Sequence, residues 1–380
     1  MRIPIYLDHN ATTPVAPTVL EAMLPHFRQS FGNPASKTHS FGWEAEHSLA
    51  TARAQVAETI GARTREIIFT SGATEANNLA IFGVAAGHKQ PAEIITTAIE
   101  HKAVLDPCRE LEKKGWVIHR IPPNSQGRVE LSQIEKKLSE NTALISVMAA
   151  NNETGTLQPL REIGTLARNA EVPLHSDAAQ AVGKVPLDVE ELGVDLLSIS
   201  DHKIYGPKGI GALYVKSRPK FRLSPIQFGG GHERGLRSGT VPVPLAVGLG
   251  AAALLSEQLR TAETERLNNL TARLWTGLHS ELPDAVRHGH RSETIPGTLS
   301  VGFPGIEAEA LLLGVPELAI SSGSACTSAE LEPSHVLRSM GVPPLLAHGS
   351  VRFGLGRSTR REEVDFAVDR VVATVRRLRS

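Results

Sequence analysis

Cysteine is scarce in this chain, since Cys108 and Cys326 are the two cysteines among 380 residues. Two cysteines cannot form a disulfide framework, which indicates a reducing compartment. No run approaches the ~18 consecutive apolar residues of a membrane span, and the opening MRIPIYLDHNATTP has no apolar stretch like that of a signal peptide. We therefore expect a cytoplasmic protein without a membrane segment.

An excess of charge of either sign is also lacking. Lys plus Arg and Asp plus Glu each number 40, so the formal net charge is zero, and this balance does not suggest a binder of nucleic acid or of a membrane surface. Hydrophobic residues make up 41% and charged residues 21%, as in ordinary globular proteins. A chain of 380 residues is long for one core and predicts two domains, one of them large.

Short apolar runs alternate with helical patterns over most of the chain, which predicts crossover units and a mainly parallel sheet of the seven-stranded type. The predicted strands are 66–70, 93–98, 143–150, 172–177, 195–200 and 211–215, with helices near 102–114 and 160–170. A long helix near 243–282 and the strands GTLSVGF, LAISSG and SVRFGLG then predict a smaller α+β domain. We expect a large domain over 15–255 and a small domain made of 1–14 and 256–380.

Polar residues follow the predicted strands, where open parallel sheets bind ligands. In SISDHKIYGPKG, Lys203 comes just after a strand. A lysine there can form a Schiff base if desolvation lowers its pKa. A lone lysine at this place is more often a solvated loop residue.

Asp177 ends another apolar strand, in LHSDAAQAVGK, and Gln180 follows three residues later. A buried carboxylate needs a partner. The pyridinium nitrogen of pyridoxal phosphate (PLP) would be one, because PLP enzymes pair a Schiff-base lysine with an acidic partner. Taken alone, an aspartate at this place is more often an ordinary helix N-cap.

Two stretches could hold a phosphate. Ala73 and Thr74, in TSGATEANNLAI, lie between a strand and a helix, where free N–H groups and the helix dipole attract an anion. The glycine-rich FGGGHERGLRSGT, with Arg237, Ser238 and Thr240, could be a lid or a second phosphate contact.

Three further residues are candidates. His101 and Asn152 each follow a strand closely, and Arg352 lies on an apolar strand of the small domain. Its planar guanidinium could pair with a structural carboxylate or hold a substrate carboxylate with two hydrogen bonds.

Cys326 lies in SSGSACTSAEL, a small and polar loop that is unlike the apolar surroundings of a core cysteine. A lysine, an acid, a phosphate cradle and a carboxylate clamp together predict a PLP enzyme that acts on amino acids. A mobile thiolate would add a nucleophile for sulfur, and loops of small residues are suited to such movement.

The combination resembles the group I cysteine desulfurases of the NifS/IscS kind, within the class V aminotransferase family of PLP enzymes. The resemblance covers nearly the whole chain. It is carried, in order, by YLDHNATTPV, FGNPAS, FTSGATEANNLAI, EHKAVLDPC, NNETG, HSDAAQAVGK, HKIYGPKGIGALY, GGGHERGLRSGT and SSGSACTSAELEPSHVL. It implies PLP fold-type I, a homodimer, L-cysteine as substrate, L-alanine as product, and sulfur passed to acceptor proteins such as an iron–sulfur scaffold.

The resemblance also implies a role for each candidate. Lys203 would be the Schiff-base lysine, Asp177 the pyridinium partner, Gln180 a donor to the ring hydroxyl, and His101 a ring-stacking proton shuttle. Cys326 would be the nucleophile that receives the sulfur. The phosphate would be held by Ala73, Thr74, Ser200, His202 and, across the dimer interface, Thr240. The substrate carboxylate would be held by Asn152 and Arg352, and Asn152 would also bind the cofactor near its ring hydroxyl.

One departure from the family concerns Asp201, where glycine or alanine is usual. A carboxylate near a phosphate is unfavourable unless it points away or pairs with a cation. Three other functions remain open from the sequence: a selenocysteine lyase on the same scaffold, an aminotransferase in which Cys326 is incidental, and a scaffold without activity.

Overall fold

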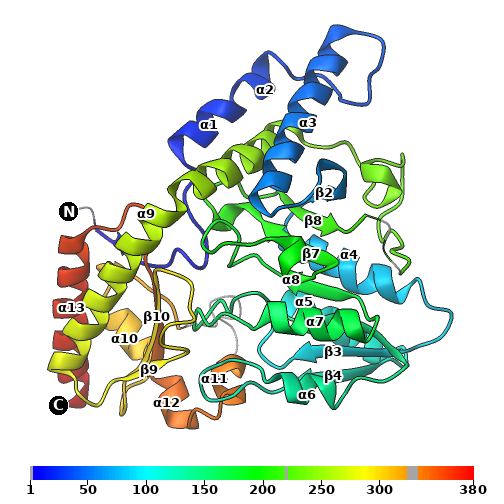
Figure 1. Ribbon diagram of the computed structural model, residues 1–380. Helices are drawn as coiled ribbons and strands as arrows, with labels where there is room; N and C mark the ends of the chain where they lie inside the picture. Colours follow the sequence, from blue (N-terminus) through cyan, green and yellow to red (C-terminus); the bar gives the residue numbers. More distant parts are fainter. Residues whose placement is uncertain (1–2, 218, 220, 323–332) are drawn as a thin grey trace.

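The computed structural model describes residues 3–217, 219, 221–322 and 333–380. Its centre is a seven-stranded sheet in which β8 is antiparallel to both of its neighbours and the other pairs are parallel (Figure 1). The strand order is β2 (Ile67–Thr70), β8 (Gly211–Val215), β7 (Leu196–Ser200), β6 (Leu174–Asp177), β5 (Thr142–Ser146), β3 (Glu93–Thr97) and β4 (Val117–Ile121). The predicted α/β class with a mainly parallel sheet is confirmed.

The sheet is buried on both faces because its strands alternate apolar side chains between two hydrophobic cores. In β2, Ile67 and Phe69 belong to one core and Ile68 to the other. Helices α3 (Ser40–Thr59) and α7 (Leu160–Asn169) pack on the first face, and α4 (Ala73–Ala85) and α5 (Lys102–Glu112) on the second. The shorter helices of this part are α1 (Pro17–Met23), α2 (Pro25–Arg28), α6 (Leu131–Glu135) and α8 (Val189–Leu192).

A second, smaller sheet lies beside the first and has the antiparallel order β12 (Ser350–Gly354), β10 (Thr298–Gly302) and β9 (Val286–His288). Near it, β1 (Ile5–Tyr6) pairs with β11 (Leu318–Ala319), so the start of the chain joins the C-terminal part (Figure 1). The helices of this part are α10 (Ala308–Gly314), α11 (His335–Ser339), α12 (Pro344–His348) and α13 (Arg361–Arg379).

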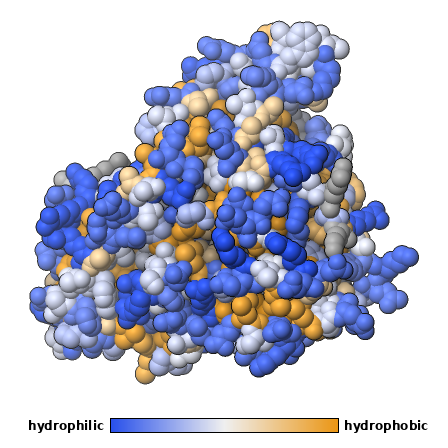
Figure 2. All heavy atoms as spheres, in the orientation of Figure 1, coloured by the Kyte–Doolittle hydropathy of each residue, from blue (hydrophilic) through white to orange (hydrophobic). Residues whose placement is uncertain are grey.

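The 39-residue helix α9 (Val243–Glu281) connects the two parts. Leu249, Ala252 and Ala253 pack in the core of the large sheet, whereas Leu267 and Leu274 pack in the core of the small one. Most of the face shown in Figure 2 is hydrophilic, with apolar side chains in patches between the polar ones. Within the described residues, no helix combines the length and the apolar character needed to cross a membrane. The boundary at residue 255 stays a prediction.

One close approach in the sheet shapes the site. A Cβ added at Gly211 would lie 2.4 Å from the Ile199 carbonyl oxygen and 2.6 Å from the Gly72 Cα. Gly72 has a φ of 151° and lies directly before α4. The absence of a side chain at position 211 therefore lets the turn that begins α4 lie against β8.

We expect Gly211→Ala to lower both thermal stability and affinity for the cofactor, because the methyl group must push apart two backbone segments. Overpacking of this kind costs about 1–3 kcal/mol. The control is Gly277→Ala in α9, where the added Cβ would meet only the Val368 side chain, at 2.9 Å. Thermal denaturation and PLP titration of both variants check this, and equal behaviour of the two would contradict the steric account.

Candidate active site

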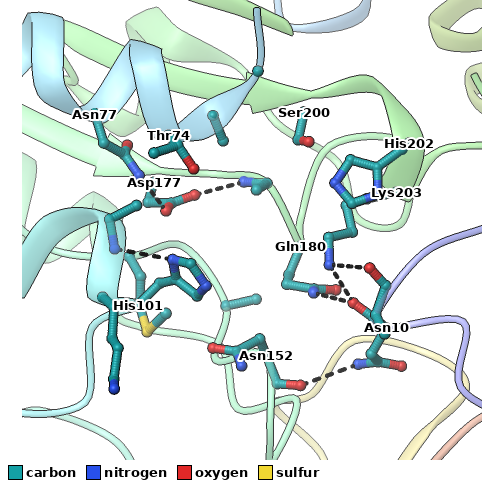
Figure 3. A pocket seen from close by; sticks show the side chains of 18 of the residues that line it. Asn10, Thr74, Asn77, His101, Asn152, Asp177, Gln180, Ser200, His202 and Lys203 are labelled. Atoms are coloured by element: carbon teal, nitrogen blue, oxygen red, sulfur yellow. Dashed lines mark hydrogen bonds between the residues drawn. The ribbon is translucent and has the colours of Figure 1, made fainter. Parts of the chain in front are cut away.

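A cavity of about 440 Å³ opens at the carboxyl ends of the central strands, beside the starts of α4 and α5 (Figure 3). A volume of this size is ordinary for a cofactor site. Ten of the predicted residues line it: Ala73, Thr74, His101, Asn152, Asp177, Gln180, Ser200, His202, Lys203 and Arg352. Residues from six separate segments therefore meet in one place, as the strand-end reasoning predicted.

Asp177 ends β6 with a side chain that is almost fully buried, at 6% exposed. Its Oδ2 accepts a hydrogen bond from Asn77 Nδ2 at 2.7 Å, and its Oδ1 accepts one from the Ala179 amide at 3.0 Å (Figure 3). These are neutral donors to a carboxylate that lines the cavity. A cationic ring nitrogen of a bound cofactor would be the missing charged partner.

Lys203 closes the short 3-10 helix η2 (Asp201–Lys203), which follows β7 directly. Its Nζ donates to the Asn10 carbonyl oxygen at 2.5 Å and to the Ala11 carbonyl oxygen at 2.8 Å (Figure 3). Carbonyl oxygens orient an ammonium group without neutralising it. The amine therefore lies across the cavity from Asp177, available to a carbonyl group of a ligand.

The phosphate cradle is the N-terminus of α4. Among the described residues no side chain caps this end, although Thr70 Oγ1 accepts a hydrogen bond from the amide of Gly72 just before it. An uncapped N-terminus of a 13-residue helix, open to a cavity, attracts an anion through its amide groups and its dipole. Ser200 and His202 line the same cavity.

His202 is a neutral hydrogen-bonding group in this pocket. Burial, together with the charge of Lys203, lowers the pKa of its imidazole to about 4. Its Nδ1 lies 3.1 Å from Thr12 Oγ1, which fixes the ring. A neutral imidazole can still donate one hydrogen bond to a phosphate oxygen.

His101 caps α5, since its Nδ1 accepts the Ala103 amide hydrogen at 3.1 Å (Figure 3). The neutral ring then carries its proton on Nε2. The cap hydrogen bond fixes the orientation of the imidazole in the cavity. A ring that stacks on a cofactor and transfers protons needs a fixed orientation of this kind.

Arg352 comes from β12 and is 2% exposed. Its Nη1 donates to the Asn152 carbonyl oxygen at 2.8 Å, and its Nη2 to Asp8 Oδ1 at 2.7 Å. Its buried Nε has no hydrogen-bond partner among the described residues. The predicted clamp is thus already tied to a structural carboxylate, and each terminal nitrogen keeps a second N–H group.

Thr240 is exposed and does not line the cavity. Cys326 lies outside the described residues. Arg237, in the same glycine-rich stretch as Thr240, pairs with Glu75 at 2.8 Å, so this stretch is bound to α4. The part assigned to Thr240, in a partner's site, stays a prediction.

The departure at Asp201 has a physical resolution. Its side chain is fully buried, and within the part of the chain that the structure describes neither of its carboxylate oxygens has a hydrogen-bond partner. A Cβ at Gly206 would lie 1.8 Å from Asp201 Oδ1, so the carboxyl group packs against that glycine and not into the cavity. Burial raises its pKa well above the usual range, and a neutral carboxyl group does not repel a phosphate.

Sequence reasoning gave no role to several residues that line the cavity: Asn10, Asn77, Glu153 and His335. Asn77 and Asn10 lie within motifs that carry the family resemblance, but their contacts depend on the fold. Glu153 is buried, and Ser334, just before α11, donates to its carboxylate. This bond ties the segment after residue 332 to the residue beside Asn152.

The donors of this cavity fit PLP. An uncapped helix end suits its phosphate, a buried carboxylate suits its ring nitrogen, and a lysine suits its aldehyde. Among the residues that the structure describes, no cluster of His, Cys, Asp and Glu could hold a metal ion. Fold and site together define a PLP enzyme of fold-type I.

The chain belongs to the family described as Aminotransferase class-V, whose model matches residues 5–366, and PLP is the cofactor of this family. It is 52% identical to cysteine desulfurase IscS of Rickettsia felis, over 99% of this chain and 92% of the relative. It is 53% identical to the mitochondrial cysteine desulfurase of Drosophila melanogaster, over 99% of this chain and 82% of the relative.

Solved structures agree with this assignment. A NifS-like protein superposes with a TM-score of 0.91 at 38% identity, covering 98% of this chain and 99% of its own. A NifS-like protein from Rickettsia africae gives 0.87 at 31% identity, covering 98% and 99%. The predicted family and fold-type are therefore confirmed.

We expect Asn77→Ala to lower turnover about tenfold, because a hydrogen bond to a charged group contributes about 1.5–3 kcal/mol. Without the hydrogen bond from Asn77, the carboxylate of Asp177 would stabilise the protonated ring nitrogen of the cofactor less well. The control is Asn78→Ala, a half-buried neighbour whose side chain donates to the Thr74 carbonyl oxygen. Steady-state kinetics on both variants check this, and unchanged turnover in Asn77→Ala would contradict it.

Proposed function

We propose that the protein is a cysteine desulfurase, which removes the sulfur of L-cysteine, releases L-alanine and leaves a persulfide on Cys326. The observation that carries the proposal is the meeting of Lys203, Asp177 and Arg352 in one cavity, in a chain half identical to cysteine desulfurases over its whole length. A further structural neighbour, described as SspA in complex with cysteine, superposes with a TM-score of 0.81 at 38% identity, covering 92% of this chain and 98% of its own.

Bound PLP supplies an electron sink for the carbanion that forms when the α-proton of the substrate leaves. Lys203 takes this α-proton as a base once its amine is free. Asp177 keeps the ring nitrogen protonated, and Gln180 donates to the ring oxygen. His101 moves protons between solvent and the substrate, which its pocket-facing Nε2 allows.

The substrate carboxylate binds at Arg352 and Asn152. A carboxylate would bind to the remaining N–H groups of the two terminal nitrogens of Arg352. Asp8 already orients this guanidinium, so the substrate meets a preformed donor set. Orientation of this kind lowers the cost of bringing the reacting atoms together.

The thiolate of Cys326 then attacks the substrate sulfur. An S–S bond forms between the two sulfur atoms, the substrate Cβ–S bond breaks, and the carbon that loses sulfur takes a proton to give L-alanine. The other cysteine is unsuited to this step: Cys108 is buried in α5, and burial raises the pKa of its thiol to about 12. A thiol that stays protonated is a poor nucleophile.

The proposal includes a cytoplasmic homodimer that passes sulfur to acceptor proteins for iron–sulfur cluster assembly or thiolation. A contact face for a second copy is supported by large exposed aromatic residues near α2 and α3, where the tilted rings of Phe31 and Phe41 have centroids 5.4 Å apart. Phe27 and Trp43 are also exposed, each at 56%. Exposed apolar side chains that gather in patches mark interaction sites.

The test is the release of sulfide and alanine from L-cysteine, with and without a thiol reductant. We expect equal amounts of both products with reductant. Without it, one turnover should add the mass of one sulfur atom to the peptide that contains Cys326. Cys326→Ser should bind L-cysteine normally and lose sulfur transfer, because a serine hydroxyl is a weak, protonated nucleophile.

The matched control is Cys108→Ala, which should keep the added mass and a near-normal rate. A persulfide on Cys108, or sulfide release at the normal rate by Cys326→Ser, would refute the assignment of the nucleophile. High activity on selenocysteine with little on cysteine would favour a selenocysteine lyase in place of a desulfurase.

A further inference from the structure

Lys184 has no part in the roles given above. It lies in the turns after β6, four residues beyond Gln180, and it is partly buried. Its Nζ donates to Gln180 Oε1 at 2.9 Å, while Gln180 Nε2 donates to the Asn10 carbonyl oxygen at 2.8 Å. The two ends of the Gln180 amide therefore have different partners.

These partners permit one orientation of the amide. An ammonium group only donates hydrogen bonds, and a carbonyl oxygen only accepts them. A flipped amide would place its NH₂ group against Lys184 and its oxygen against the oxygen of Asn10. Both hydrogen bonds would be lost, and each unsatisfied buried group costs about 1–3 kcal/mol.

The orientation matters because Gln180 lines the cavity close to Lys203 and Asn10 (Figure 3). The amide nitrogen has two hydrogens, and the bond to Asn10 uses one. The other can serve a ligand only if the nitrogen, and not the oxygen, faces the cavity side. A flipped Gln180 would place its amide oxygen against an oxygen atom of the cofactor ring, and two acceptors cannot form a hydrogen bond.

We propose that Lys184 is a positioning residue that fixes the amide of Gln180 as a hydrogen-bond donor toward the ring oxygen of PLP. The inference rests on the role proposed for Gln180. The Asn10 carbonyl oxygen is shared, because Lys203 also donates to it, whereas Lys184 binds the other end of the amide.

The electrostatic surroundings agree with a role in the loaded enzyme. Burial, together with the charges of Lys203 and Arg352, lowers the pKa of Lys184 to about 7. When the Lys203 nitrogen gives up its proton, part of this repulsion disappears, and the charged form of Lys184 is favoured. Four further titratable or charged groups are near Lys184: His9 and His202, whose pKa values its charge lowers, and Glu263 and Arg357, which pair with each other beside a cavity of about 30 Å³.

The test is a pH titration of the visible absorption band of the PLP-loaded enzyme, which reports the proton on the nitrogen that joins Lys203 to the cofactor. A donor at the ring oxygen withdraws electrons and makes this proton leave more easily. We expect Lys184→Met to raise the midpoint of this titration by about one pH unit, because the ring oxygen then lacks the hydrogen bond that helps the proton to leave. The separate variant Lys184→Arg keeps a hydrogen-bond donor and a positive charge at this position, and it should have the same midpoint as the wild type.

The charge of Lys184 could shift the same midpoint directly, so the titration is repeated in a Gln180→Ala background. If Lys184 acts through Gln180, Lys184→Met causes no further shift there. An equal shift in both backgrounds, or no shift in either, would overturn the proposal. Lys184→Ala gives the same comparison if methionine at this position prevents folding. The titration reads the cofactor and not sulfur transfer, so it decides the role of Lys184 even in a protein without desulfurase activity.

Discussion

The pocket depends on one buried charge, the carboxylate of Asp177. It lies at the end of a central strand, is nearly inaccessible to water, and has two neutral hydrogen-bond donors. Such a charge is costly without a cation. Lys203, at the end of the adjacent strand β7, is held by carbonyl oxygens across the cavity and leaves space between the two side chains for a cationic ring.

The other charges of the pocket are arranged so that few of them oppose a phosphate or a carboxylate. Burial lowers the pKa of His202 to about 4 and raises that of Asp201, which favours the uncharged form of each group beside α4. Arg352, a deeply buried cation, is oriented by Asp8 and by a carbonyl oxygen. Protonation states set by desolvation thus prepare one end of the cavity for phosphate and another for a substrate carboxylate.

Much of the site could be predicted from the sequence because parallel strands end at one edge of a sheet. That rule alone brings His101, Asn152, Asp177 and Lys203 together, and the structure has them around one cavity. The limits of the long helix α9 were also predicted closely, since its pattern is continuous. The edge strand β4 was missed, because its exposed and half-buried residues lack the apolar run of a central strand.

Contacts between distant segments could not be predicted in this way. Asn10 reaches the site from the first residues of the chain, which pair with the C-terminal part through β1. The tie between Arg352 and Asp8 joins residues 344 positions apart, and no local pattern signals it. The same holds for Lys184, whose spacing from Gln180 shows proximity but not which end of the amide it binds.

Among the described residues, three lysines line the cavity, namely Lys102, Lys203 and Lys208. We assign the covalent bond to the cofactor to Lys203. The most direct measurement is borohydride reduction of the purified, PLP-loaded protein, followed by digestion and mass spectrometry. The account predicts a reduced pyridoxyl phosphate adduct on the peptide that contains Lys203, and none after Lys203→Ala. An adduct on Lys102 or Lys208, or one that persists in Lys203→Ala, would contradict it.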